Sequence, residues 1–397
     1  MELSKRITTM PSSAMRKLAP FAVAAEEKGV KVYHLNIGDP DIKSPQQVLN
    51  KLHNWDINPI RYCNSQGEKV FLESQAKYYQ NLGYDWVKTE NILATIGGSE
   101  GILMIFLALC EPGDEVICFD PLYSNYATTA HITGVKIVAV PTSIGNGFHL
   151  PSREIIEKYI TPKTKAILYC NPNNPTGTVY TKDEVEMLVN IAKDRDLFLV
   201  SDEVYREFNF SVEPHVSILD YMQGMPDRLI MLDSLSKRFS LCGARVGNVV
   251  SLNKDFLSMI LKFAISRLSA GLVDQVMASV INDVPESFTK DLQSEYRKRR
   301  DVLYSLIREI PGVTVSLPEG AFYMMVGLPV KDSERFCKWL LEEFRDNNET
   351  VMFAPGAGFY ATPGMGLNEV RIAYVLNVDS IKRSIELLKI ALQQYKD

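Results

Sequence analysis

A lysine flanked by hydroxyl groups directly follows an apolar run in the second half of the chain. The run, 228–232, is bounded by glycine and proline and predicts a short buried strand. It leads into Ser234, Ser236 and Lys237, and Arg245 follows the lysine by eight residues. A lysine amine condenses with an aldehyde, whereas serines and an arginine suit a phosphate. The segment therefore predicts a site for a phosphorylated aldehyde, although a Ser-x-Ser-Lys turn alone is also common in solvated loops.

A second turn that suits a phosphate consists of Gly97, Gly98 and Ser99. It lies between a predicted strand that begins at Ile92 and an apolar helix that extends to Leu109. Backbone amides at a helix N-terminus favour an anion. The turn is neither a Walker loop nor a dinucleotide-binding fingerprint, because the lysine and the third glycine are missing. Small residues that permit close helix packing explain the turn equally well.

Polar and aromatic side chains stand at the ends of three other predicted strands. Tyr123, Asn174 and Asp202 each end or follow such a strand, and Tyr205 comes three residues after the aspartate. A buried carboxylate is costly unless it is paired, so Asp202 implies a cationic partner. Plain packing is a common reason for an aromatic residue such as Tyr123 at a strand end. Because ligands bind outside the carboxyl ends of strands in α/β sheets, we expect these residues to share one site.

The order of the predicted elements indicates an α/β fold. Strands and helices alternate from 112 to 202, and the strands are apolar throughout. This pattern is typical of a mostly parallel sheet with helices on both faces. The expected strands are 115–119, 136–140, 165–170, 197–201, 228–232 and 245–252, and the expected helices are 68–82, 123–133, 153–159 and 182–195.

The length of 397 residues predicts two domains. A long helical region ends at Pro311 and Gly312, and a smaller α/β pattern follows. We expect the strand near Val32 to join this smaller domain. The expected strands there are 313–317, 321–326, 351–354 and 369–375, and the expected helices are 334–344 and 380–394.

Composition and charge exclude several classes of protein. The net charge of −5 gives no electrostatic reason to expect a nucleic-acid partner. The longest apolar stretch, 102–110, is too short to cross a bilayer, and the N-terminus lacks the apolar core of a secretory signal. The six cysteines are scattered without metal-ligand spacing. We therefore expect reduced cysteines, no metal site and a cytoplasmic protein.

The strand ends together carry the groups that pyridoxal 5′-phosphate needs. Lys237 would take the aldehyde, Asn174 and Tyr205 the phenolic oxygen, and Tyr123 would stack on the ring. Asp202 would keep the ring nitrogen protonated, which makes the ring an electron sink for a substrate carbanion. The phosphate is expected at Ser99, Ser234 and Arg245, and Gly98 and Ser236 are counted with them as cofactor-binding residues.

Three motifs resemble those of the class I/II pyridoxal-phosphate aminotransferases of fold type I. They are Asn-Pro-x-Asn-Pro-Thr-Gly at 171–177, Asp-x-x-Tyr at 202–205, and Ser-x-Ser-Lys at 234–237 with the arginine eight residues later. Their order and approximate intervals match over nearly the whole chain. The resemblance implies a large cofactor domain with a mostly parallel seven-stranded sheet, a small α/β domain and a homodimer. The domains are then expected at 46–290 for the large one and 291–397 for the small one, with 1–45 as an N-terminal arm and part of the small domain.

The resemblance also implies several substrate contacts. Arg371 stands where the family binds the substrate α-carboxylate, although composition alone suggests a salt-bridging strand arginine. Gly38 and Asn174 are expected beside the substrate, and Tyr62 resembles a tyrosine that reaches the partner subunit's phosphate. Some aspartate aminotransferases carry a lysine for the distal carboxylate where this chain has a serine, so Arg267 is a candidate replacement. An interface arginine paired with a carboxylate explains Arg267 equally well.

The activity implied is a ping-pong transamination between an L-amino acid, with aspartate favoured, and 2-oxoglutarate through a Schiff base on Lys237. The catalytic residues are then Lys237, Asp202 and Tyr205, and no membrane or nucleic-acid partner is expected. An aminotransferase for aromatic or neutral amino acids is one alternative. A C–S β-lyase that shares the cofactor residues is another. A non-catalytic effector-sensing module is disfavoured, because residues 1–35 are too short for a preceding DNA-binding domain.

Overall fold

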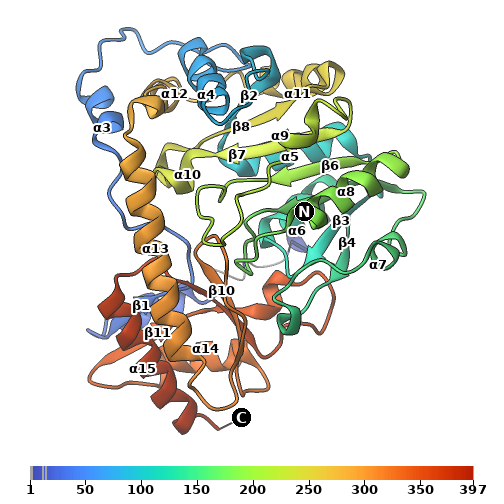
Figure 1. Cartoon of the computed structure of the whole chain (residues 1–397). Helices are drawn as coiled ribbons and strands as arrows, with labels where there is room; N and C mark the ends of the chain where they lie inside the picture. The colour runs from blue at the N-terminus through green and yellow to red at the C-terminus, as the bar shows by residue number, and fades with distance from the viewer. Residues whose placement is uncertain (1–2, 11–12, 14–15, 397) are drawn as a thin grey trace.

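A seven-stranded sheet forms the centre of the chain, which the computed structural model describes for residues 3–10, 13 and 16–396. The strand order is β2-β8-β7-β6-β5-β3-β4 (Figure 1). β8 is antiparallel to both of its neighbours, and the other adjacent pairs are parallel. The mostly parallel sheet expected from the sequence is therefore confirmed. The strands are β2 (Ile92–Ile96), β3 (Glu115–Asp120), β4 (Lys136–Pro141), β5 (Thr164–Cys170), β6 (Phe198–Asp202), β7 (Leu229–Ser234) and β8 (Val246–Ser251).

Helices cover both faces of this sheet, because its central strands are apolar on both sides. Leu199 and Val200 are adjacent on β6 and pack into different hydrophobic clusters, the first with residues of α8 and the second with residues of α5. Among the described residues, no helix combines the length and the hydrophobicity needed to cross a membrane. The helices up to β8 and the two that follow it are α1 (Lys5–Thr8), α2 (Ala19–Glu26), α3 (Gln46–His53), α4 (Lys69–Asn81), α5 (Gly97–Leu109), α6 (Ser124–Thr133), α7 (Arg153–Glu157), α8 (Lys182–Asp194), α9 (Leu219–Met222), α10 (Leu235–Arg238), α11 (Lys254–Ser266) and α12 (Leu272–Ala278).

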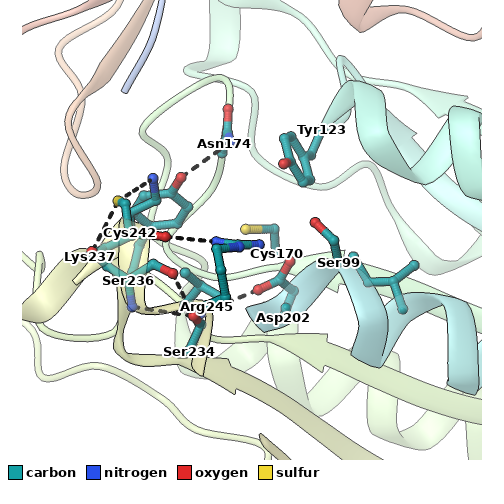
Figure 2. A pocket seen from close by; sticks show the side chains of 14 residues that line it. Ser99, Tyr123, Cys170, Asn174, Asp202, Ser234, Ser236, Lys237, Cys242 and Arg245 are labelled. Carbon is teal, nitrogen blue, oxygen red and sulfur yellow. Dashed lines mark hydrogen bonds between the residues drawn. The ribbon is translucent and has the colours of Figure 1, made fainter. Parts of the chain in front are cut away.

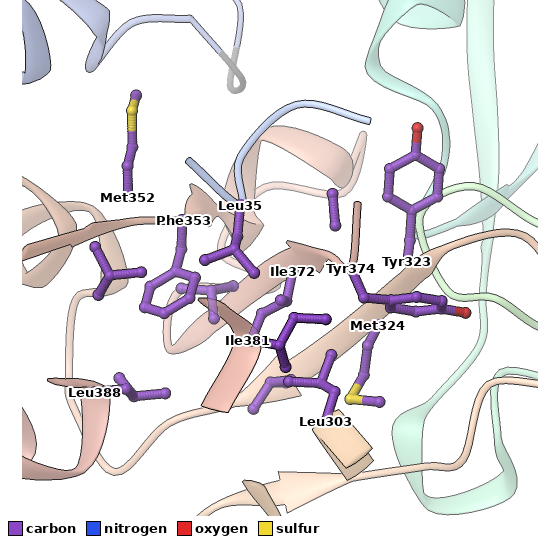
Figure 3. Close-up of a cluster of buried hydrophobic side chains, with 14 of the residues drawn as sticks. Leu35, Leu303, Tyr323, Met324, Met352, Phe353, Ile372, Tyr374, Ile381 and Leu388 are labelled. Atoms are coloured by element: carbon purple, nitrogen blue, oxygen red, sulfur yellow. The ribbon is translucent and has the colours of Figure 1, made fainter. Parts of the chain in front are cut away.

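A smaller α/β part contains segments from both ends of the chain. β1 (Lys31–His34) pairs in parallel with β11 (Glu349–Met352), so the N-terminal strand joins this part as expected. Leu35, Leu303, Ile372 and other buried side chains form its core (Figure 3). The remaining elements are a sheet of β12 (Ala354–Pro355), β13 (Glu369–Ala373), β10 (Tyr323–Gly327) and β9 (Thr314–Val315), with helices α13 (Glu286–Ile307), α14 (Ser333–Glu342) and α15 (Val378–Gln394).

Some boundaries differ from those expected. The strand expected at 351–354 is two strands, because β11 pairs with β1 whereas β12 pairs with β13 in another sheet. β7 continues to Ser234 because its last residues pair with β8. The helix α13 continues through the domain boundary expected between 290 and 291 and reaches from the large sheet to the smaller part (Figure 1). The domain boundaries themselves stay a prediction.

Candidate active site

A cavity of about 120 Å³ lies where β5, β6 and β7 end and α5 begins (Figure 2). Every cofactor-binding residue expected from the sequence lines this cavity except Tyr62. The ends of parallel strands meet at one edge of a sheet, which explains why residues far apart in the sequence converge here. Ile102, Cys170, Val204 and Cys242 also line the cavity and had no expected role.

The amine of Lys237 lies inside the cavity on the short helix α10, directly after β7. Its Nζ donates hydrogen bonds to the carbonyl oxygen of Gly38 at 2.8 Å and to Sγ of Cys242 at 3.5 Å. A larger residue at Gly38 would have to displace the ring of Tyr323, because its Cβ would lie 1.9 Å from Oη. Burial lowers the pKa of Lys237, but Tyr323, Cys242 and Tyr123 together raise it above 10.5. A charged amine therefore faces the cavity.

The carboxylate of Asp202 is buried at the end of β6. Tyr126 donates a hydrogen bond to Oδ2 at 2.6 Å, and the amide of Val204 donates one to Oδ1 at 3.3 Å. Burial raises the pKa of Asp202 to about 6, although the bond from Tyr126 lowers it. Within the described residues, no lysine, arginine or histidine forms an ion pair with it, so the expected cationic partner is not a side chain of this chain. A protonated pyridine nitrogen fits this place.

Hydroxyl groups, a guanidinium and a helix N-terminus lie together beside the lysine and make a candidate anion site. Oγ of Ser234 lies 2.8 Å from Oγ of Ser236, and both serines line the cavity. Arg245 has a left-handed backbone with a φ of 50°. Its guanidinium packs against Gly97, the first residue of α5. The contact is so close that a Cβ on Gly97 would lie only 2.7 Å from Nη2 of Arg245. Arg245 and the free amides of α5 together suit a phosphate.

Arg371 is fully buried on β13 without a carboxylate partner among the described residues. Its Nη1 donates to Oδ1 of Asn174 at 2.9 Å, and its Nη2 donates to the carbonyl oxygen of Asn36 at 2.7 Å. The guanidinium carbon lies 4.3 Å from the ring centre of Tyr323, and burial lowers the pKa of Arg371. It is therefore not the salt-bridging arginine that composition suggests. An unpaired buried cation favours an anionic ligand.

Four expected site residues do not line the cavity. Gly38 and Arg371 are hydrogen-bonded to the lining residues Lys237 and Asn174, and the other two are Arg267 and Tyr62. Arg267 forms an ion pair from Nε to Oε1 of Glu100 at 2.8 Å and donates from Nη2 to the carbonyl oxygen of Ala94 at 2.7 Å. This is the paired arrangement that the sequence left open as an alternative. Tyr62 is 77% exposed in a loop before α4. Its role in a partner subunit stays a prediction.

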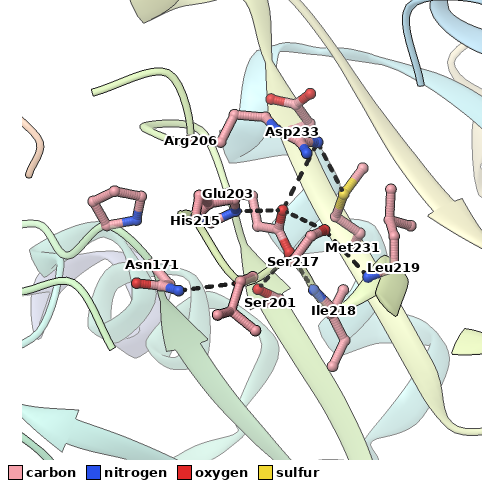
Figure 4. Close-up of polar contacts among 12 residues, drawn as sticks. Asn171, Ser201, Glu203, Arg206, His215, Ser217, Ile218, Leu219, Met231 and Asp233 are labelled. Atoms are coloured by element: carbon pink, nitrogen blue, oxygen red, sulfur yellow. Dashed lines mark hydrogen bonds and ion pairs between the residues drawn. The ribbon is translucent and has the colours of Figure 1, made fainter. Parts of the chain in front are cut away.

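A buried polar network holds the segment that follows Asp202 (Figure 4). Glu203 is fully buried and accepts hydrogen bonds from Nε2 of His215 at 3.0 Å, Oγ of Ser217 at 2.8 Å and the amide of Ile218 at 2.8 Å. Burial raises the pKa of Glu203, but His215 and the other donors lower it further, to below its ordinary value. Several bonds to one ionised group fix its position, so the neighbouring Asp202 is held rigidly.

Three residues that make polar contacts with expected site residues were missed. Tyr126 follows Tyr123 by three residues, and in the helix expected at 123–133 this spacing puts both side chains on one face, which is a usable signal. In the structure α6 begins at Ser124, directly after Tyr123. Tyr323 lies 2.9 Å from Oη of Tyr205 but comes from the smaller part, and no local pattern marks it. Cys242 stands in the turn between Lys237 and the following arginine, where its spacing alone says nothing about its side chain.

Known proteins match the chain over nearly its full length. Residues 30–386 match the family model for aminotransferase class I and II. The aspartate aminotransferase of Thermotoga maritima is 30% identical, covering 98% of both chains. The aromatic-amino-acid aminotransferase 2 of Thermococcus litoralis is 28% identical and covers 100% of both. The solved structure of an alanine aminotransferase from Pyrococcus furiosus is 26% identical with a TM-score of 0.89, covering 99% of this chain and 100% of that one.

These matches confirm the resemblance that the motifs indicated, and they extend it from the motifs to the architecture. The seven-stranded, mostly parallel sheet and the α/β class agree with solved aminotransferase structures of fold type I. The chain belongs to the aminotransferase class I and II family.

Proposed function

We propose that the protein is a pyridoxal-phosphate-dependent aminotransferase that transfers an amino group between an L-amino acid, with aspartate favoured, and 2-oxoglutarate. One observation carries the proposal. The amine of Lys237 and the carboxylate of Asp202 line a single cavity. Among the described residues, no cationic side chain forms an ion pair with Asp202, whose hydrogen bond comes from Tyr126. Arg371 has no carboxylate partner in the described part of the chain and is hydrogen-bonded to the cavity residue Asn174.

The residues around the cavity fit pyridoxal phosphate. When bound, the cofactor supplies an electron sink for the carbanion at the substrate Cα. Asp202 would hold the ring nitrogen protonated, because a nearby cation lowers the pKa of a carboxylate. The phosphate would bind to the N-terminus of α5, to Arg245 and to the hydroxyl groups of Ser234 and Ser236. Nδ2 of Asn174 lies 3.4 Å from Oη of Tyr205, and both groups would donate hydrogen bonds to the ring oxygen.

The chain's own groups would carry out the proton transfer. Lys237 lies at the cavity wall, and the cationic ring of the bound cofactor would lower the pKa of its amine. In its neutral form the amine would take the α-proton, and as an ammonium it would return the proton to the cofactor's reactive carbon, so that it acts as general base and acid. Arg371 would bind the α-carboxylate in a fork and so fix the orientation of the substrate Cα.

Two observations bear on the substrate side chain. The Thermotoga maritima relative carries the name aspartate aminotransferase, which supports aspartate. The uncharged Ser99 lines the cavity, and Arg267 is already paired with Glu100. No unpaired cation for a distal carboxylate is therefore evident in the described part of one subunit. This second observation favours aromatic or neutral amino acids as the alternative.

The proposal includes a homodimer in the cytoplasm that acts on small molecules. The 77% exposure of Tyr62, in a loop outside its own cavity, supports a contact with a second copy. All six cysteines are free, which supports a reducing compartment.

A screen of half-reactions tests the function. The cofactor-loaded enzyme is mixed with single amino acids in the absence of a 2-oxo acid, and loss of the visible cofactor band is recorded. We expect aspartate to bleach the band fastest and 2-oxoglutarate to restore it. Faster bleaching by phenylalanine or alanine would favour the alternative substrates. Pyruvate and ammonia released without a 2-oxo acid acceptor would identify a C–S β-lyase instead.

A further inference from the structure

The thiol of Cys242 lies beside the amine of Lys237 inside the cavity (Figure 2). Nζ of Lys237 donates to Sγ at 3.5 Å, and Sγ in turn donates to the carbonyl oxygen of Ser236 at 3.1 Å. We propose that Cys242 is a positioning residue that holds the amine of Lys237 for proton transfer while this amine is not bonded to the cofactor. The inference rests on the proposed function, because it assigns a role within the same site.

Two parts of the chain hold the amine together. The carbonyl oxygen of Gly38 approaches from the segment after β1, and Cys242 approaches from the turn that follows α10. In the ammonium form, with three donors, two fixed acceptors leave one N–H for the substrate, and in the neutral form they leave the lone pair. The carbonyl alone would let the amine swing about a single bond. The bond from Sγ to Ser236 fixes the thiol, and the thiol therefore limits that motion.

The charge state of the thiol suits positioning rather than reaction. Burial raises the pKa of Cys242, Lys237 lowers it and Asp39 raises it, and the net pKa lies above its ordinary value of 9.0. A neutral thiol is a weak acceptor that leaves the amine free to react, whereas a carboxylate at this place would hold it as an ion pair. The same raised pKa disfavours a nucleophilic or redox role, since the reactive form of cysteine is the thiolate.

The first test compares Cys242→Ala with Cys242→Ser in the cofactor-loaded enzyme. Alanine removes the acceptor, and we expect kcat to fall about tenfold with KM little changed, as for a lost hydrogen bond. The isotope effect with Cα-deuterated aspartate should rise, because proton transfer becomes slower. Serine restores an acceptor and should recover most of the lost kcat. Wild-type kcat and isotope effect in Cys242→Ala would overturn the proposal, and equal losses in both variants would reduce Cys242 to filling space.

The second test needs no turnover. In the chain stripped of cofactor, iodoacetamide alkylation of Cys242 is followed against pH by peptide mass spectrometry, with Cys110 as internal reference. Because the ammonium of Lys237 lowers the pKa of the thiol, Lys237→Met should move the profile of Cys242 to higher pH and leave that of Cys110 in place. Tyr323, Tyr123 and Asp39 also face this pair and are unchanged in the comparison.

Identical alkylation profiles at Cys242 in the two chains would show that the contact with the amine does not exist, and the proposal would fail. That failure is distinct from a failure of the proposed function, which would appear as an absence of half-reaction with every amino acid while the profiles still differ.

Discussion

Tyr126 donates a hydrogen bond of 2.6 Å to the carboxylate of Asp202, and both side chains are buried. A neutral phenol satisfies one oxygen of the carboxylate but does not balance its charge. Burial consequently keeps the pKa of Asp202 at about 6 despite this bond. A cation placed beside this carboxylate would stabilise its charged form and lower its pKa. In return, the carboxylate would keep a pyridine ring nitrogen protonated.

The stability of the cofactor-free chain should depend on this carboxylate. The pKa of Asp202 is about 6 in the folded chain, against 3.8 ordinarily, so the folded chain binds the proton more tightly. Its stabilising contribution is complete below about pH 4 and is lost as the pH rises through about 6. A shift of about two pKa units corresponds to about 3 kcal/mol.

Asp202→Asn removes this dependence. Urea unfolding of both cofactor-free chains at about pH 4 and about pH 7 measures it. The wild-type chain should lose up to about 3 kcal/mol relative to the variant over this range. Parallel losses in the two chains would contradict the raised pKa.

Arg371→Ala should reduce kcat/KM for every amino acid by about 30-fold to several thousand-fold, because truncating one partner of a buried charge pair costs about 2–5 kcal/mol. The loss should be similar for aspartate and alanine, which share the α-carboxylate. Arg371→Lys keeps the charge without the fork and should fall between. Absorbance of the bound cofactor serves as the control for folding. A loss confined to aspartate would assign Arg371 to the distal carboxylate.

Arg267→Ala separates the two roles that the sequence left open. The ion pair with Glu100 favours a structural role, so we expect similar losses of kcat/KM for aspartate, glutamate, alanine and phenylalanine. Stability should fall by about 1–3 kcal/mol, because the half-buried Glu100 is left without its partner. Adding Glu100→Gln should recover part of that loss. A selective loss for the two acidic substrates would give Arg267 the substrate role instead.

Mixed dimers test the predicted contribution of Tyr62 to the partner site. One chain carries Lys237→Ala and the other carries Tyr62→Phe. If Tyr62 acts across the interface, one site of the mixed dimer contains both defects and the other contains neither, so about half of the wild-type sites remain. If Tyr62 acts within its own chain, each site has one defect and no wild-type-like site forms. Equal activity in the mixed and parent dimers would therefore contradict the shared site.

Much of the fold and the cavity could be predicted because the relevant signals are local. Apolar runs mark the strands of the central sheet, and residues at strand ends such as Asp202 and Lys237 converge wherever parallel strands end together. The turn at Gly97 likewise predicts the start of a helix, and α5 begins there. Each of these predictions needs only a short window of sequence and one rule of topology.

Other features depend on contacts between distant segments, which periodicity does not encode. Tyr323 approaches Tyr205 only because the smaller part packs over the cavity. Arg267 forms an ion pair with Glu100, which is 167 residues away in the chain. From the sequence alone, a structural ion pair and a substrate contact explain Arg267 equally well. The uncharged partner of Asp202 also depends on how α6 is rotated against the sheet. In all three examples the partner of the side chain is set by the tertiary structure and not by the local sequence.

Reduction with borohydride tests the central claim most directly, namely that Lys237 carries the cofactor. Borohydride converts a lysine–aldehyde linkage into a stable amine, and peptide mapping then finds the labelled residue. Lys237 lies in the cavity with its amine 2.8 Å from the carbonyl oxygen of Gly38, beside the serines and the arginine of the anion site. The account predicts label on the peptide that contains Lys237 and its loss in Lys237→Ala. Label on any other lysine, or none in a chain that retains bound cofactor, would contradict it.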